Sequence, residues 1–204
     1  MKSFHSLPFL GVVMFAAAAC GTQRVETGLT ASLSQKFSTY AYKVENREVA
    51  LIVDYEVARL RKKENYFPLD VIIANKRLPS VTITRDSLIL VDSTGKSYPM
   101  ATITEIQWAY PKLLADSDFK YSTFESEQQP LTGFSYFERQ RSNFFPQRAG
   151  GARVTDSVIL PPRGYINDRL YFPMPDTGID GQRLTLRLVA EELEAPIEVN
   201  FILK

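Results

Sequence analysis

The sequence predicts an all-β protein, and three observations carry that prediction. Apolar and polar residues alternate with a period of two in several stretches, which is typical of β-strands with one buried face. Glycine, proline, asparagine and aspartate mark turns between these stretches. No stretch shows the 3.6-residue periodicity of a convincing amphipathic helix. We therefore expect short strands arranged as a two-sheet β-sandwich.

The first two strands are expected between residues 49 and 75. The segment EVALIVDYEVARL has one apolar face, with Asp54 and Glu56 on the opposite face. A basic turn, RLRKKEN, separates it from YFPLDVIIANK, which predicts the second strand. The apolar face of the first strand consists of Val49, Leu51, Val53, Tyr55 and Val57.

The remaining strands follow the same alternation. SVTITRDSLILVDSTGKSYPM predicts strands before and after a turn at 92–95. DSVILPPRGYINDRLYFPMP predicts two short strands around a Pro-Pro-Arg-Gly turn. The chain ends in a predicted hairpin whose apolar positions are Leu184, Leu186 and Leu188 in one arm and Ile197, Val199, Phe201 and Leu203 in the other.

Two of these segments resemble a known domain family. FPLDVIIANKRLPSVTITRDSLILVDSTGKSYPM is similar to the front half of the immunoglobulin-like (telokin-like) domains of many uncharacterised bacterial lipoproteins, and GYINDRLYFPMP is similar to a later strand of those domains. The resemblance covers residues 46–106 and 156–204. It implies an immunoglobulin-like sandwich, and it brings no catalytic residues with it.

The N-terminus reads as a secretory signal peptide over residues 1–19. Lys2 precedes an apolar run that is too short to span a bilayer, and small residues lead to Cys20. The sequence AAAC resembles the lipobox of bacterial lipoproteins, which implies cleavage before Cys20 and acylation of its sulfur. Ordinary secretion is the alternative, because Ala17-Ala18-Ala19 also satisfies the rule for signal-peptide cleavage.

The expected domain organisation follows from these features. Residues 20–38 form a lipidated N-terminus and flexible tether, rich in serine and threonine, and residues 39–204 form the sandwich domain. Two or three acyl chains at Cys20 anchor a protein stably. Because Gly21 follows the cysteine, the resemblance implies the outer membrane in a Gram-negative source, at its periplasmic face or the cell surface.

Composition excludes several function classes. His5 is the only histidine and lies within the predicted signal peptide, and Cys20 is the only cysteine. A mature chain that has no histidine, and whose one cysteine is acylated, lacks the groups for Ser-His-Asp or Cys-His catalysis and for histidine- or cysteine-based metal sites. The 24 basic and 23 acidic residues give no basic excess for nucleic-acid binding. We expect no cofactor, no metal and no catalytic residue.

Residues 107–155 form a long insertion between the two halves of the predicted sandwich. Ten aromatic residues lie among the 38 from Trp108 to Phe145, which argues against disorder. One interpretation is that these rings cover one end or face of the sandwich. The other is that some are exposed and form a binding surface. The candidate residues of that surface are Trp108, Tyr110, Tyr136, Phe137, Arg139 and Arg141.

Short motif matches do not alter this assessment. TGKS at 94–97 lacks the upstream glycine of a phosphate-binding loop, and DTG at 176–178 occurs only once, whereas an aspartic protease needs two. DSDFKYSTFESE resembles an EF-hand loop in its carboxylates, but Lys120 and Tyr121 stand where an oxygen ligand and a glycine are needed.

Three hypotheses for function follow. The first is a non-catalytic, lipid-anchored envelope protein that acts as an interaction or structural module, with an envelope protein as partner. The second is a binder of glycan or lipid, in which Trp108, Tyr110, Tyr136 and Phe137 line a groove. The third is a hydrolase that uses carboxylates alone.

Overall fold

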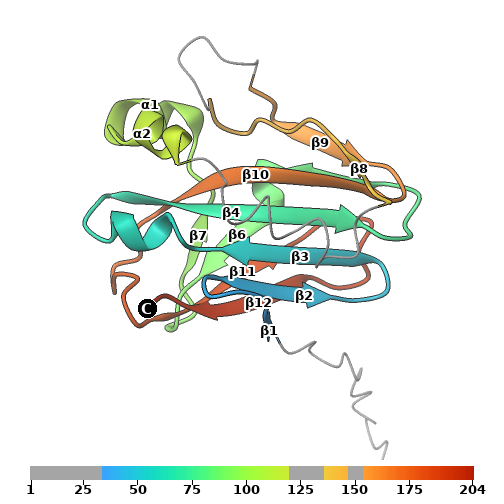
Figure 1. Ribbon diagram of the computed structural model, residues 1–204, viewed down its shortest axis with the longest axis horizontal. Helices are drawn as coiled ribbons and strands as arrows, with labels where there is room; N and C mark the ends of the chain where they lie inside the picture. Colours follow the sequence, from blue (N-terminus) through green and yellow to red (C-terminus); the bar gives the residue numbers. More distant parts are fainter. Residues whose placement is uncertain (1–33, 120–135, 147–153) are drawn as a thin grey trace, which may run out of the picture. The chain divides into compact units, whose positions relative to one another are not determined.

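β-Strands dominate the structure, as the sequence predicted. The computed structural model describes residues 34–119, 136–146 and 154–204 (Figure 1). Its largest sheet has six strands in the order β1-β2-β3-β4-β10-β8. Neighbouring strands are antiparallel except β10 and β8, which are parallel. The strands are β1 (Gln35–Lys36), β2 (Ala41–Glu45), β3 (Val49–Asp54), β4 (Tyr66–Asn75), β8 (Glu138–Arg139) and β10 (Gly164–Pro173).

A second sheet of four strands and a short pair of strands complete the sandwich. The four-stranded sheet has the order β12-β11-β6-β7, and the pair consists of β5 and β9. The C-terminal hairpin and the turn between β6 and β7 are confirmed, and Gly95 in that turn has φ of 87°. These strands are β5 (Val81–Thr84), β6 (Leu88–Val91), β7 (Ser97–Pro99), β9 (Ser157–Leu160), β11 (Arg183–Leu188) and β12 (Ile197–Ile202).

The main hydrophobic core lies between the six-stranded sheet and the other two. Alternate residues of β3, β4 and β10 point into it, and Leu186 and Phe201 of the facing sheet meet them. The predicted inward positions of the C-terminal hairpin are all buried. The two-sheet sandwich is therefore the fold of this chain. Its assignment as immunoglobulin-like stays a prediction.

The central strands differ from the expected half-buried pattern. All six residues of β3 and nine of the ten in β4 are buried, including Asp54, which was expected on the face opposite the apolar residues. The outer face of this sheet has its own small apolar cluster, in which Phe37, Phe137 and Tyr165 pack against buried residues. Alternation fails here because both faces of the sheet are covered.

Strand β3 is shorter than expected, and short helices occur where none was predicted. β3 ends at Asp54, and the 3₁₀ helix η1 (Ala58–Arg61) follows. A second 3₁₀ helix, η2 (Arg85–Ser87), precedes β6. Helix α1 (Ile103–Ala109) begins before the predicted insertion and ends inside it, and α2 (Leu113–Asp118) lies within it. A helix of six or seven residues is too short to show amphipathic periodicity.

Parts of the predicted insertion and tether belong to the sandwich. Tyr110, Phe144 and Phe145 are buried in the main core, and the rings of Tyr110 and Phe145 lie 5.3 and 5.0 Å from the ring of Tyr171. At the N-terminal side, β1 pairs with β2 although it falls within the predicted tether. The described sandwich thus begins before residue 39.

Candidate functional site

The helix pair α1–α2 is the most distinctive feature among the described residues. Thr102 begins α1 with a reciprocal cap: its hydroxyl accepts from the Glu105 N–H at 3.2 Å, and the Glu105 carboxylate accepts from the Thr102 N–H at 2.7 Å. Ile106 and Tyr110, four residues apart, point into the core. Pro111 then separates the two helices, because proline disfavours a helical conformation in the residue before it.

A buried ion pair lies on the outer face of the six-stranded sheet, next to α2. Arg169 on β10 donates to both carboxylate oxygens of Asp70 on β4, at 2.7 and 3.0 Å. The two residues are partners across the antiparallel strands, and each is 5% exposed. Arg169 also donates to the backbone carbonyl of Asp116, at the inner side of α2. The guanidinium therefore joins the sheet to the helix.

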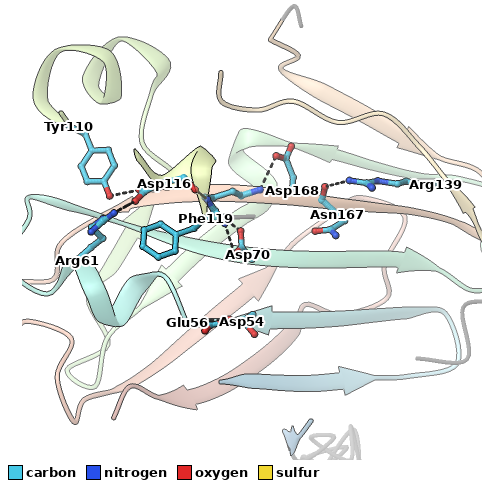
Figure 2. Close-up of polar contacts among 11 residues, drawn as sticks. Asp54, Glu56, Arg61, Asp70, Tyr110, Asp116, Phe119, Arg139, Asn167 and Asp168 are labelled. Carbon is cyan, nitrogen blue, oxygen red and sulfur yellow. Dashed lines mark hydrogen bonds and ion pairs between the residues drawn. The ribbon is translucent and has the colours of Figure 1, made fainter. Parts of the chain in front are cut away.

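A second set of polar contacts fixes α2 from the opposite side (Figure 2). The Asp116 carboxylate is fully buried, and one of its oxygens accepts from two nitrogens of Arg61 in η1, at 2.7 and 2.6 Å. Its other oxygen accepts from the Tyr110 hydroxyl at 2.5 Å. Burial and the adjacent Asp116 carboxylate raise the pKa of Tyr110, so this phenol stays a donor.

Asp54 adds a third carboxylate to the same face of the sheet. It is the cross-strand partner of Asp70 and accepts from the Glu56 N–H at 2.7 Å. Burial raises the pKa of Asp54 to about 7, and the nearby charges of Asp70 and Glu56 add to this, while the Glu56 N–H and Arg169 oppose it. Burial also raises the pKa of Asp70, although Arg169 opposes that shift. When Asp54 is neutral, the positive charges of Arg169 and Arg61 therefore equal the negative charges of Asp70 and Asp116.

The outward side of the helix pair carries two large apolar side chains. Trp108 is 86% exposed and Leu114 is 52% exposed. Each lies two residues from an inward residue, Ile106 in α1 and Asp116 in α2, which places it on the opposite face of its helix. We define the helix tip as the exposed residues Trp108, Ala109, Pro111, Lys112, Leu114 and Ala115. The exposed polar residues Thr104, Glu105 and Gln107 of α1 adjoin it.

The other predicted surface residues lie around β8. Tyr136 is 85% exposed, Arg139 and Arg141 are exposed, and Phe137 is half-buried against the outer apolar cluster. The backbone N–H of Glu138 donates to the carbonyl of Arg163, just before β10, and that of Gln140 donates to the carbonyl of Tyr165 in β10. We call the surface formed by Tyr136, Arg139 and Arg141 the β8 surface.

The structure therefore separates the six predicted site residues into three places. Trp108 belongs to the helix tip, Tyr110 is 2% exposed in the core, and the other four lie at or beside β8. β8 pairs with β10 at Gly164 and Tyr165, whereas Arg169 contacts α2. Figure 1 shows α1 and α2 near one end of β10 and β8 at the other. The two contact regions of β10 are separated by roughly 15 Å of strand.

One groove lies elsewhere, beside β5. It has a volume of about 370 Å³ and is lined by residues of β5, η2 and the segment after β11. Thr82 and Thr84 line it together with Glu192, which accepts from the Thr82 N–H and hydroxyl at 3.0 and 2.7 Å. No aromatic residue lines this groove. The arrangement predicted for an aromatic ligand-binding groove does not form there.

Sequence reasoning missed the buried charges and the start of α1, although both left a signal. Asp70 interrupts the apolar strand FPLDVIIAN, and the polar run Asn167-Asp168-Arg169 interrupts the apolar residues of YINDRLYF. Thr102 and Glu105 have the spacing of a capping box directly before Ile106. Asp116, the first carboxylate of the EF-hand-like match, accepts hydrogen bonds from the Arg61 guanidinium and the Tyr110 hydroxyl.

Two further predictions concern the N-terminus and the membrane. Cys20 lies outside the described residues, so its lipidation stays a prediction. Within the described ranges, no helix has the length and apolar character needed to cross a membrane. No protein-family model matches this chain, and no curated protein or solved structure is significantly similar to it.

Proposed function

We propose that this chain is a non-catalytic, lipid-anchored protein of the cell envelope that acts through contact surfaces. One observation carries the proposal: two large aromatic side chains, Trp108 in α1 and Tyr136 beside β8, are 86% and 85% exposed. Figure 1 shows α1 and β8 near opposite ends of β10. Side chains of this size are concentrated in the cores of interfaces. Cys20 would supply the anchor and the preceding residues the signal peptide.

Four buried carboxylates are not accessible to a substrate, whereas Asp86, Glu191 and Glu192 line the groove beside β5. A hydrolase that uses two carboxylates must bring both to its substrate. Asp54, Asp70 and Asp116 are at most 6% exposed, and hydrogen bonds within the protein engage all three. Asp168 is fully buried and accepts from the Phe144 N–H at 3.0 Å. These groups stabilise the junction of sheet and helices.

The β8 surface is the candidate contact for a protein partner. Tyr136 offers a large amphipathic ring, and Arg139 and Arg141 offer guanidiniums that bind carboxylates bidentately. Tyrosine and arginine are two of the residue types enriched at energetically important positions in protein interfaces. We infer an envelope protein with an acidic contact surface as the partner.

The anchor is tested by metabolic labelling with an alkyne fatty acid. The wild type is expected to incorporate the label and to fractionate with membranes. Cys20→Ser is expected to lose both properties, whereas the neighbouring control Thr22→Ala keeps them. Release of an unlabelled wild-type protein in soluble form would rule out the anchor and favour ordinary secretion.

The partner is tested by crosslinking in cells, comparing the wild type with Tyr136→Ser/Arg141→Ala. The expected result is one crosslinked protein that the double variant loses and that the control Arg183→Ala retains, since Arg183 is exposed on the other sheet. Equal melting transitions establish that all three proteins are folded. A crosslinking pattern identical in the double variant would exclude the β8 surface as the contact.

A further inference from the structure

We propose that the helix tip is a membrane-contact surface, which inserts shallowly into the headgroup region of a bilayer that contains anionic lipid. The inference begins with the composition of the tip. Of its six exposed residues, five are uncharged and apolar, and the sixth is Lys112. Tryptophan is enriched at membrane–water interfaces, where its apolar ring and its N–H group find separate environments.

The tip is held rigidly in an outward orientation. Asp116 is fixed by Arg61 and Tyr110, and its backbone carbonyl accepts from Arg169. The same helices that bury Ile106 and Asp116 turn Trp108 and Leu114 to solvent. A surface ordered before contact loses less conformational entropy when it inserts.

A basic rim lies beside the tip. The Arg61–Asp116 contact places η1 next to α2, and the Arg61 guanidinium lies 5.6 Å from the centre of the Phe119 ring. Leu60 in η1 is 45% exposed and Lys63, just after it, is exposed. Lys63 and Lys112 are two exposed positive charges, complementary to anionic headgroups, and Glu105 of α1 is one exposed negative charge beside them. Apolar tip and basic rim are the two components of interfacial binding.

The size of the tip favours lipid over protein as the occupant. Stable protein interfaces use about 20–30 residues a side, whereas nine described residues of α1, α2 and their linker are exposed, including Thr104, Glu105 and Gln107 beside the tip. Its distance from the anchor is also suitable. Thirteen residues lie between Cys20 and Ser34, the first described residue, so the two ends of this segment are at most about 50 Å apart. A tethered sandwich can therefore reach the same bilayer; this last argument rests on the proposed lipid anchor, and the others do not.

Trp108 provides the test, because it is the only tryptophan in the chain. The full-length protein is mixed with vesicles of phosphatidylglycerol and phosphatidylcholine at 1:1, and with phosphatidylcholine vesicles alone. We expect the emission of Trp108 to shift to the blue on the anionic vesicles. Quenching by aqueous acrylamide should fall at least twofold, and lipids brominated near the headgroup should quench the emission.

Charge variants test the basic rim. Lys112→Glu changes two unit charges at the tip and is expected to weaken the Trp108 response to anionic vesicles by at least tenfold in lipid concentration. The matched reversal Arg183→Glu, on the outer face of the four-stranded sheet, should change it less than twofold. Both sites are exposed, so both variants are expected to fold. Equal responses of the two variants would overturn the role of the rim.

Failure of the tip and failure of the anchor are distinguishable. If the protein sediments with vesicles while Trp108 stays fully accessible to acrylamide, the tip is not a membrane contact and the proposal is overturned, whatever the state of Cys20. If Cys20→Ser still shows the blue shift on anionic vesicles, the tip binds lipid independently of acylation, which supports the proposal even if the anchor is absent.

Discussion

The two ends of β10 hold their exposed surfaces in different ways. At the α2 end, Arg169, Asp116 and Arg61 connect sheet and helices through buried, charge-assisted hydrogen bonds. At the β8 end, a two-residue strand is attached by parallel backbone pairing, and Arg139 reaches the Asn167 carbonyl only at 3.5 Å. The helix tip is thus fixed by side chains in the interior, whereas the β8 surface lies on an edge strand.

This difference indicates at which end charged side chains contribute to the stability of the fold. Burying two charges costs desolvation free energy, which their mutual attraction offsets. Removal of one partner leaves an unpaired buried charge and therefore lowers stability far more than removal of both. An exposed arginine at an edge contributes little to stability and is free to change. The following predictions test the contrast from its largest expected effect to its smallest.

Breaking the buried pair should have the largest effect. Arg169→Met leaves the Asp70 carboxylate buried without its partner and should lower the free energy of unfolding by about 3–5 kcal/mol. Urea unfolding measures the loss. The double variant Asp70→Leu/Arg169→Met should lose much less, because no unpaired charge stays buried. A double variant as unstable as the single one would contradict the assigned role of the pair.

Protonation of Asp54 should make stability depend on pH. Its pKa is about 7 in the folded chain and 3.8 as a model value, so the folded state binds the proton more tightly. The contribution of Asp54 to stability is present below pH 4, falls as the pH rises toward 7, and is then lost. The total is at most about 4 kcal/mol, at about 1.36 kcal/mol for each pH decade.

Asp54→Asn should remove this contribution. Unfolding curves at several pH values are expected to show that the free energy of unfolding of the variant, relative to that of the wild type, rises by roughly 3 kcal/mol between pH 4 and pH 8. The comparison isolates Asp54, because Asp70 and the other carboxyls titrate in both proteins. Parallel profiles of the two proteins would show that Asp54 is charged at neutral pH.

The bond between Tyr110 and Asp116 should have an intermediate effect. Tyr110→Phe removes the hydroxyl donor and leaves one oxygen of a buried carboxylate unsatisfied, which should cost about 1–2 kcal/mol. Amide hydrogen exchange in α2 should accelerate more than exchange in β11. Tyr136→Phe is the matched control, since Tyr136 is 85% exposed, and it should change neither quantity.

Arg141→Ala tests the β8 end and should have the smallest effect. Arg141 is exposed, so its truncation is expected to change the free energy of unfolding by less than about 0.5 kcal/mol. Thermal melting is sufficient to measure this. A loss above 1 kcal/mol would show that the β8 end is held by its side chains as firmly as the α2 end.

The sequence predicted the solvent-facing parts of the sandwich better than its centre. In β11 and β12 one face is wet, so apolar residues such as Leu186 and Val199 alternate with polar ones. β3 is buried on both faces, and the sequence of the strand itself does not indicate which residues cover its outer face. The burial of Asp54 therefore could not be read from alternation.

The candidate site was harder to predict because its contacts are distant in sequence. Arg169 and Asp70 lie 99 residues apart, and Arg61 and Asp116 lie 55 apart, so no local pattern connects them. The enrichment in aromatic residues identified the segment that contains the exposed aromatic side chains, but it did not distinguish the exposed residues from the buried ones. Trp108 and Tyr110 are two residues apart, and a helix of seven residues sends one to solvent and leaves the other in the core.

Strand β1 gives the sandwich a defined response to mechanical load. A chain held at its N-terminus transmits force first to the two residue pairs of β1 and to the Ser34 hydroxyl, which accepts from the Asn200 N–H at 2.7 Å. β2 has five residue pairs with β3 and a place beside the core. A pulling experiment should therefore record a small early extension of about 20 Å as residues 34–40 detach, before the sandwich itself yields. Under such a load the edge strand would detach first and lengthen the chain before the sandwich unfolds.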